Sequence, residues 1–341
     1  MNVVAFKVNS LGDNLRFLPV VQELRRRVPE WRVTVITQPS AAELYAGPLA
    51  PTRLWTVDKD RFNGAYRHPW TLLRWAARVR RERPDLCLLP YDQSNVAHLV
   101  ARLSGARARS GGNLSRIRVA GTLSRVVPEP EDAAPHTWNW RIAAAGMGAL
   151  GVPWPGSPPP PDVSHLAAMR AHPLRERPRL VVHAGAGNAH NRWARENFAA
   201  VAAGLAAEAD VEWVNDGRTG AAPAGTREVR PATLGALAGC LAEADLCLVN
   251  NSGPMHLADA LGCPGVAVTG PTAPGWDPVW NRAKWTVLRH PALECGPCEP
   301  LAQAFGACAN REAPMACLNY WTAARVASAC RERLAALARS P

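Results

Sequence analysis

The sequence predicts an α/β protein built from two domains, each with a parallel sheet. Three observations lead to this prediction. Apolar runs short enough to be strands alternate with segments of helical periodicity, which is the pattern of a parallel α/β sheet. The alternation stops at a proline-rich segment, residues 151–162, and then starts again. The chain has 341 residues, of which 48% are hydrophobic, so it is long enough to bury two cores.

The first half, residues 1–150, is expected to form one domain. Its strand-like runs are 3–8, 32–37 and 85–89, and its helical segments are 15–28, 70–83, 96–103 and 136–150. Prolines in 151–162 exclude a helix or a central strand, so residues 151–178 are interpreted as a Pro-rich linker.

The second half repeats the alternation and is expected to form a domain over residues 179–320. Its strand-like runs are 179–183, 211–215, 246–249 and 265–269, and its helical segments are 197–209 and 233–242. Two similar halves joined by a linker suggest a ligand held in a cleft between them. An amphipathic last helix, in residues 321–341, could cross back to brace the first half.

Positive charge is concentrated in the first half. Residues 1–150 hold 22 basic and 12 acidic side chains, a net of +10 of the total +11. This excess fits either a solvated basic face or an acidic partner, such as a phosphorylated or carboxylated substrate or the anionic inner membrane surface. We expect no nucleic acid partner, because no zinc finger, basic helix or aromatic-interleaved basic platform is evident.

Neither a membrane-spanning segment nor a secretion signal is evident. No run of about 18 uncharged apolar residues occurs, and the N-terminus passes directly into a strand-like run. We therefore expect a cytoplasmic protein. The tryptophans of the first half, Trp31, Trp55, Trp70 and Trp75, are interpreted as core anchors, with contacts to a sugar or to a membrane interface as alternatives.

The stretch 246–262 contains the most informative strand-loop-helix pattern. A buried strand is followed by Asn250-Asn251-Ser252-Gly253, and Pro254 suits the first position of a helix. The free amides of such a helix start form a good seat for a phosphate. His256 falls in the first turn, where its side chain can point toward the same ligand.

Two more turns follow strands and carry candidate functional residues. Ser10, Gly12 and Asp13 follow the first strand, where Asp13 is either a simple helix cap or a carboxylate that accepts a proton from a substrate hydroxyl. After the strand 179–183, Gly185-Ala186-Gly187 lets the backbone approach a ligand closely, and Arg192 offers donors suited to phosphate oxygens.

Together, these three segments and the loop Gly270-Pro271-Thr272 resemble glycosyltransferase family 9, the ADP-heptose:lipopolysaccharide heptosyltransferases. The resemblance covers nearly the whole chain in the right order. It implies a GT-B fold, in which two Rossmann-like domains face a central cleft, and a metal-independent, inverting transfer of a heptose from ADP-heptose. The implied acceptor is an acidic saccharide such as the lipopolysaccharide inner core.

The resemblance also implies roles for individual residues. Asp13 would be the general base, and Arg192 would stabilise the leaving diphosphate. The remaining residues of the implied nucleotide-sugar site are Ser10, Gly12, Gly185, Ala186, Gly187, Asn251, Ser252, Gly253 and His256. Two positions depart from the family pattern: Asn251 stands where the family usually has Asp, and Asp216 stands where a glutamate for the ribose is expected.

Four cysteines lie close together before the last helix. Cys295, Cys298, Cys308 and Cys317 have the spacing C-x2-C-x9-C-x8-C, and four thiolates could hold a structural zinc or iron ion. The alternative is that they are reduced and buried. The family resemblance adds that a subgroup that heptosylates bacterial surface proteins uses such a loop for iron.

Other functions remain compatible with the sequence. Within the enzyme class, the alternatives are a protein heptosyltransferase, an antibiotic-pathway glycosyltransferase and a nucleotide-sugar epimerase that shares the fold. A GT-B binding protein that has lost catalysis is the alternative of another class, because Asn251 lacks the expected charge.

Overall fold

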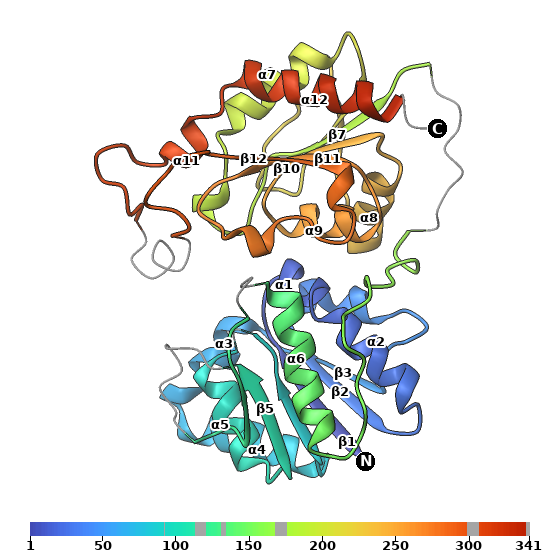
Figure 1. Ribbon diagram of the computed structural model, residues 1–341, viewed down its shortest axis with the longest axis vertical. Coiled ribbons are helices and arrows are strands. Elements are labelled where there is room, and N and C mark those ends of the chain that lie inside the picture. The colour runs from blue at the N-terminus through green and yellow to red at the C-terminus, as the bar shows by residue number, and fades with distance from the viewer. Residues whose placement is uncertain (92, 113–120, 131–133, 168–175, 299–306, 339–341) are drawn as a thin grey trace. The chain divides into compact units, whose positions relative to one another are not determined.

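The computed structural model describes residues 1–91, 93–112, 121–130, 134–167, 176–298 and 307–338. The chain divides into two compact units, Met1–His165 and Leu166–Pro341, each built around a six-stranded parallel sheet (Figure 1). The predicted α/β class with two parallel-sheet domains is confirmed. No helix among the described residues is both long enough and apolar enough to span a bilayer.

The sheet of the first unit has the strand order β3-β2-β1-β4-β5-β6. The strands are β1 (Asn2–Lys7), β2 (Arg32–Thr37), β3 (Arg53–Thr56), β4 (Leu86–Leu89), β5 (Ala108–Gly112) and β6 (Arg125–Val127). The chain reverses its direction of winding between β1 and β4, and at such a switch point the loops diverge and leave a crevice for ligands.

Helices cover both faces of this sheet. They are α1 (Leu11–Leu15), α2 (Leu18–Arg27), η1 (Pro39–Tyr45), α3 (Lys59–Asn63), η2 (Gly64–Arg67), α4 (Pro69–Arg81), α5 (Asn95–Leu103) and α6 (Pro135–Gly148). Val4, Phe6 and Leu89 share a core with side chains of α3, α4 and α5, whereas α6 packs on β4, β5 and β6. The helix expected over 15–28 is α2, which begins at Leu18, and the separate short helix α1 precedes it.

The proline-rich segment packs on the first unit. The Gln22 side chain bonds to the backbone of Asp162, and the rings of Trp140 and Trp154 lie 4.9 Å apart. The boundary between the units, after His165, therefore falls inside the expected linker 151–178, of which residues 168–175 lie outside the described part.

The second unit repeats the topology of the first. Its strands are β7 (Arg179–His183), β8 (Asp210–Val214), β9 (Arg227–Val229), β10 (Leu246–Asn250), β11 (Gly265–Thr269) and β12 (Trp285–Arg289), in the order β12-β11-β10-β7-β8-β9. Counted from β9, this is the same winding as in the first sheet, and its switch point lies between β7 and β10.

Helices also flank the second sheet. They are η3 (Ala189–Asn191), α7 (Arg195–Leu205), α8 (Leu234–Ala242), α9 (Gly253–Ala260), η4 (Pro274–Trp276), η5 (Arg282–Lys284), α11 (Ala316–Asn319) and α12 (Ala323–Ala338). The last helix, α12, contacts α7, β10, β11 and β12, and it buries Val326 and Cys330 in the core of this unit. The apolar face of α12 thus packs on its own unit. The predicted contact of this helix with the first half is not needed to explain why that face is apolar.

Candidate functional site

Asp13 is held at the carboxyl end of β1 by two polar neighbours. The Ser10 hydroxyl donates to Asp13 Oδ2 at 2.5 Å, and Lys7 Nζ lies 3.6 Å from Asp13 Oδ1. Ser10 is the N-cap residue of α1, yet its side chain makes no capping bond to the helix backbone. The side chains of this turn therefore interact with each other rather than capping α1.

Lys7 was not expected as a site residue, although it ends an otherwise apolar strand. Its side chain is fully buried, and Nζ donates to the Tyr91 carbonyl oxygen at 2.9 Å. A buried ammonium is costly unless it is paired, so the Asp13 carboxylate and the Tyr91 carbonyl together explain its presence. The ion pair with Lys7 consequently helps to hold the Asp13 side chain in position. A lysine at the end of an apolar strand is the sequence signal that could have identified it.

A buried network fixes the same turn from the side of β2. Asn14 Nδ2 donates to the carbonyl oxygens of Asn9 and Ser10, and Asn14 Oδ1 accepts from Thr37 Oγ1 and Tyr45 Oη. Burial, and to a lesser degree the charge of Asp13, raises the pKa of Tyr45 well above its ordinary value. Tyr45 is therefore a neutral donor, and the turn that carries Asp13 is rigid.

In the second unit, Asn250 joins the two loops at the switch point. Its side chain is fully buried at the end of β10. Nδ2 donates to the Ala184 carbonyl oxygen at 2.9 Å, and Oδ1 accepts from Trp193 N at 2.9 Å. Asn250 thus ties both ends of the loop 184–193, which carries Gly185, Gly187 and Arg192, to β10.

The Gly185 turn is tight, as its glycine predicted. A Cβ at Gly185 would lie 2.9 Å from His183 Cε1 and 3.1 Å from Thr219 Cγ2. His183 Nε2 lies 3.4 Å from Asp216 Oδ2, and the bond from His183 holds the pKa of Asp216 well below its usual range. Farther along the loop, the exposed Arg192 donates Nε to the Ala186 carbonyl oxygen at 2.8 Å.

The start of α9 leaves its first amides without a side-chain cap. Ser252 is the N-cap residue, but its hydroxyl donates back to the Asn250 carbonyl oxygen at 3.2 Å. Pro254 occupies the first turn, as expected. His256 is buried, with its ring centroid 5.9 Å from that of Trp276. Amides that no side chain caps, at the positive end of a helix dipole, are suited to bind an anion.

A carboxylate lies beside Asn251, although Asn251 itself is uncharged. Asn251 Nδ2 is 3.3 Å from Asp277 Oδ1, and Arg289 Nη2 donates to the same oxygen at 2.8 Å. Both Asn251 and Asp277 are buried. Sequence reasoning missed Asp277 because it lies 26 positions away, on the loop that follows β11.

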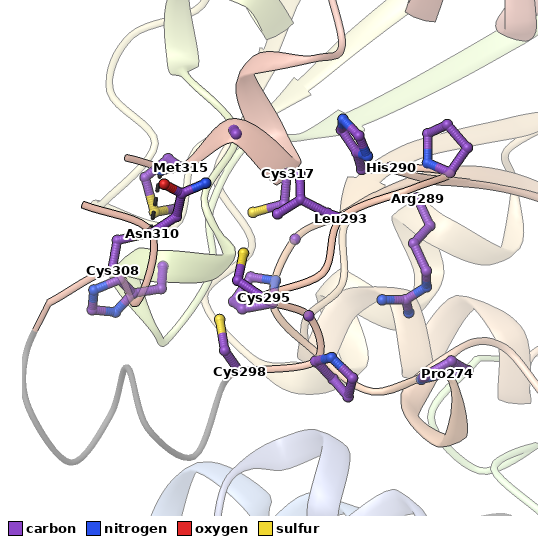
Figure 2. A pocket seen from close by; sticks show the side chains of 17 residues that line it. Pro274, Arg289, His290, Leu293, Cys295, Cys298, Cys308, Asn310, Met315 and Cys317 are labelled. Atoms are coloured by element: carbon purple, nitrogen blue, oxygen red, sulfur yellow. Dashed lines mark hydrogen bonds between the residues drawn. The ribbon is translucent and has the colours of Figure 1, made fainter. Parts of the chain in front are cut away.

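The four cysteines line one pocket with a volume of about 220 Å³ (Figure 2). Cys298 is buried, and Cys295, Cys308 and Cys317 are partly exposed. Burial, with the nearby thiols of Cys298, Cys308 and Cys295 adding to it, raises the pKa of Cys317 to about 11. Within the described residues, however, no group of three or more Cys, His, Asp or Glu side chains is arranged to hold a metal ion. The donor set suits zinc or iron, but the thiols do not form a closed site.

The family model of glycosyltransferase family 9 (heptosyltransferase) matches residues 72–307, which is more than half of the chain. The chain belongs to glycosyltransferase family 9. The predicted family is thereby confirmed. A comparison with curated proteins gave no match.

Solved structures of family members share the fold at low sequence identity. The Escherichia coli ADP-heptose lipopolysaccharide heptosyltransferase II is 19% identical with a TM-score of 0.69, and the match covers 98% of this chain and 99% of that chain. E. coli heptosyltransferase WaaC with ADP is 18% identical with a TM-score of 0.68, covering 98% and 100%. The iron-containing dodecameric glycosyltransferase TibC of enterotoxigenic E. coli is 14% identical with a TM-score of 0.55, covering 98% and 76%. The chain thus has the GT-B fold of these heptosyltransferases.

Proposed function

We propose that this glycosyltransferase moves a heptose from ADP-heptose to a hydroxyl of an acidic saccharide, such as the lipopolysaccharide inner core, by a metal-independent displacement that inverts the anomeric carbon. The observation that carries the proposal is the Asp13 carboxylate, which Ser10 and the buried Lys7 hold at the carboxyl end of β1. Membership in family 9 and the relatives described with ADP or ADP-heptose support the choice of donor.

Asp13 is the proposed general base. An ionised carboxylate of fixed orientation can accept the proton of an acceptor hydroxyl while that oxygen attacks the sugar. Lys7 pairs with one carboxylate oxygen of Asp13, and Ser10 orients the other. Ser10 and Gly12, in the same turn, would contribute to the binding of the nucleotide sugar.

The proposed donor site lies in the second unit. The uncapped amides of Ser252 and Gly253, with His256 behind them, would bind the diphosphate of ADP. Gly185, Ala186 and Gly187 allow close approach of backbone to the nucleotide sugar. Arg192 would stabilise the charge that develops on the leaving diphosphate, a task that a metal ion performs in other transferases.

The acceptor assignment depends on charge. The net charge of +10 in residues 1–150 favours a substrate with carboxylates or phosphates. An inner-core saccharide is such a substrate, and its lipid anchor places it at the inner face of a membrane. A cytoplasmic enzyme that contacts this membrane surface fits that acceptor.

The test is the release of ADP from ADP-heptose by the purified chain, with and without an inner-core acceptor. We expect release that depends on the acceptor and a heptosylated product with inverted anomeric configuration. Conversion of the donor without an acceptor would instead indicate an epimerase. Donor binding with no turnover on any acceptor would indicate a binding protein that has lost catalysis.

A second candidate is a protein heptosyltransferase, and the four-cysteine pocket favours it. TibC, which shares the fold, is described as an iron-containing heptosyltransferase with ADP-D-β-D-heptose. Cys295, Cys298, Cys308 and Cys317 supply the thiolates that zinc or iron prefers, and they would have to close around the ion to form a structural site. Elemental analysis of the purified protein should find about one zinc or iron ion per chain, lost in Cys298→Ser and retained in Cys240→Ser. Metal-free, fully active protein would contradict the metal site.

A further inference from the structure

The outer face of α4 exposes large apolar side chains that the fold does not bury. Trp70 is 80% exposed, Leu73 is 48% exposed, and Tyr66, just before the helix, is 57% exposed. These are three of the seven exposed large hydrophobic side chains in the described part of the chain, and they fall within eight consecutive residues. We call Tyr66, Trp70, Leu73, Arg74 and Arg81 the α4 surface.

Helical spacing places the members of this surface on one side. Positions 70, 73, 74, 77 and 81 follow the i, i+3, i+4, i+7 and i+11 pattern of a single helix face. Ala76 and Val79, on other sides of the helix, are buried, and Val79 belongs to the core shared with β1 and α5. The helix is therefore anchored to its unit without help from Trp70 or Leu73.

Positive charge surrounds the apolar residues. The helix carries four arginines and no acidic residue, and Arg67 and Arg83 flank it. Among the described residues, no carboxylate forms an ion pair with Arg74, Arg80 or Arg81. Of the acids that follow the helix, Glu82 is buried and paired with Arg53, and Asp85 is paired with Arg107. The guanidinium of Arg78 is stacked on Trp55, 4.1 Å from the ring centroid.

We propose that the α4 surface docks this enzyme on an anionic lipid bilayer. Tryptophan and tyrosine favour the boundary between headgroups and acyl chains, where the ring is buried and the polar atom stays hydrated. Arginines on the same face bind anionic headgroups while their stems lie along the apolar region. A helix that lies in the plane of the interface combines these two features.

The charge distribution favours an anionic bilayer over a second copy of the chain as the partner of the α4 surface. Two α4 surfaces in contact would bring unpaired arginines together without intervening carboxylates, which is unfavourable when water is excluded. A bilayer that contains phosphatidylglycerol supplies an excess of negative charge and an apolar layer in the same place. The inference does not rest on the proposed reaction, because lipid binding requires neither donor nor acceptor.

Flotation of the full chain with lipid vesicles tests the proposal. Vesicles of phosphatidylcholine alone are compared with vesicles that also contain about 30% phosphatidylglycerol, a fraction typical of strongly anionic surfaces. We expect binding only to the anionic vesicles, and loss of that binding at high salt. Trp70→Ala should lower the partition coefficient about fivefold, and Arg74→Glu with Arg81→Glu at least about tenfold.

Two control variants make the result specific. Arg125→Glu with Arg141→Glu changes the net charge by the same amount at exposed positions of the same unit, and Arg74→Lys with Arg81→Lys keeps the charge of the surface. Both should bind as the unaltered chain does, and all variants should keep its melting temperature. Equal binding to neutral vesicles, equal losses in the Arg125/Arg141 variant, or undiminished binding of the Trp70 and Arg74/Arg81 variants would each overturn the proposal. So would a dimer in solution that these α4 variants convert to monomer.

Discussion

The two units use one topology to build two chemically different loops. In the first unit, the switch point between β1 and β4 is joined by a charged side chain, since Lys7 bonds to the Tyr91 carbonyl and pairs with Asp13. In the second unit, the switch point between β7 and β10 is joined by a neutral amide, since Asn250 bonds to the Ala184 carbonyl and to Trp193 N.

This difference matches two tasks. Removal of a proton needs a carboxylate of fixed position, and the ion pair with the buried Lys7 holds Asp13 in place. Binding of a diphosphate needs donors and a helix dipole, and the neutral amide of Asn250 joins the loops without adding a negative charge of its own near the start of α9. The comparison teaches that the fold positions the loops and that single polar residues at the strand ends decide their chemistry.

Replacement of Asp13 should have the largest effect. Asp13→Ala removes the proposed base and should lower transfer by about 10³-fold or more, while donor affinity changes by a few-fold at most. Steady-state kinetics and calorimetric titration of ADP-heptose measure the two quantities. Asp58→Ala serves as a control, because Asp58 caps α3 in the same unit. Undiminished transfer by Asp13→Ala would remove Asp13 from the mechanism.

Lys7→Met should have the next largest effect on the first loop. It keeps the length of the side chain but removes the ammonium that holds Asp13, so we expect transfer to fall about a hundredfold through misplacement of the carboxylate. Donor affinity should change by a few-fold at most, since the proposed diphosphate-binding loops lie in the second unit. A Lys7→Met protein with the kinetics of the unaltered chain would show that Lys7 serves only the packing around Tyr91.

Asn250→Ala tests the neutral side chain that takes, in the second unit, the place that Lys7 has in the first. The variant leaves the Ala184 carbonyl and Trp193 N without their buried partner, which should lower the free energy of unfolding by about 3 kcal/mol. Urea denaturation measures this loss, and the KM for the donor should rise more than kcat falls. Asn319→Ala removes a single exposed bond to Pro314 and provides the control. If Asn250→Ala is as stable as Asn319→Ala, the proposed link between the two loops is wrong.

Acid should destabilise the first unit before the second. Burial lowers the pKa of His98, on α5, from 6.5 to about 4. The unfolded chain binds this proton near pH 6.5, whereas the folded chain binds it only near pH 4. The contribution of His98 to the free energy of unfolding is therefore fully present above pH 6.5, and the free energy of unfolding is lower by about 2 kcal/mol at pH 5.

In the second unit the pKa values of Glu208, Asp216 and Glu228 are lowered, so their contributions are present above the ordinary values of 4.5, 3.8 and 4.5 and are lost only as the pH falls below these values. Hydrogen exchange, analysed by peptide, should therefore show faster exchange in residues 1–165 than in 176–338 when the pH drops from 7 to 5, after correction for intrinsic rates. His98→Gln should reduce this difference, and an equal response of both units would contradict it.

The smallest effect is expected from an exchange of charge between Asn251 and Asp277. Asn251→Asp puts two carboxylates side by side, and Asp277→Asn leaves Arg289 without its ion pair. Each single change should weaken donor binding about fivefold, whereas the double variant should return to within about twofold. If the effects of the two single changes on donor binding add in the double variant, the two side chains act independently.

Sequence reasoning predicted the central strands of both sheets and missed most of the outer ones. Apolar runs such as 3–8 and 246–249 are buried on both faces, and their composition shows it. The strands β3, β5, β6, β9 and β12 are short, or contain Arg, Ser or Gly, and they become strands because a neighbour pairs with them. Pairing partners far away in the sequence leave no local pattern.

The same distinction holds for the candidate site. Ser10, Asp13, Gly185 and the Asn250 turn were recognisable because each motif is continuous in the sequence. Asp277 was not, since its relation to Asn251 depends on the course of the loop after β11. The arrangement of the four thiols around one pocket also required the fold, because spacing alone does not say which way each side chain points (Figure 2).

The most direct test of the account is the melting temperature of the purified chain with ADP, UDP, GDP and their sugars, ADP-heptose included, at equal concentrations. A ligand that binds only the folded state at a hundredfold excess over its Kd adds about 2.7 kcal/mol of stability, which such a measurement detects easily. The account predicts an increase confined to ADP and ADP-heptose. No increase with any nucleotide, or an increase with UDP alone, would contradict the assignment of the donor.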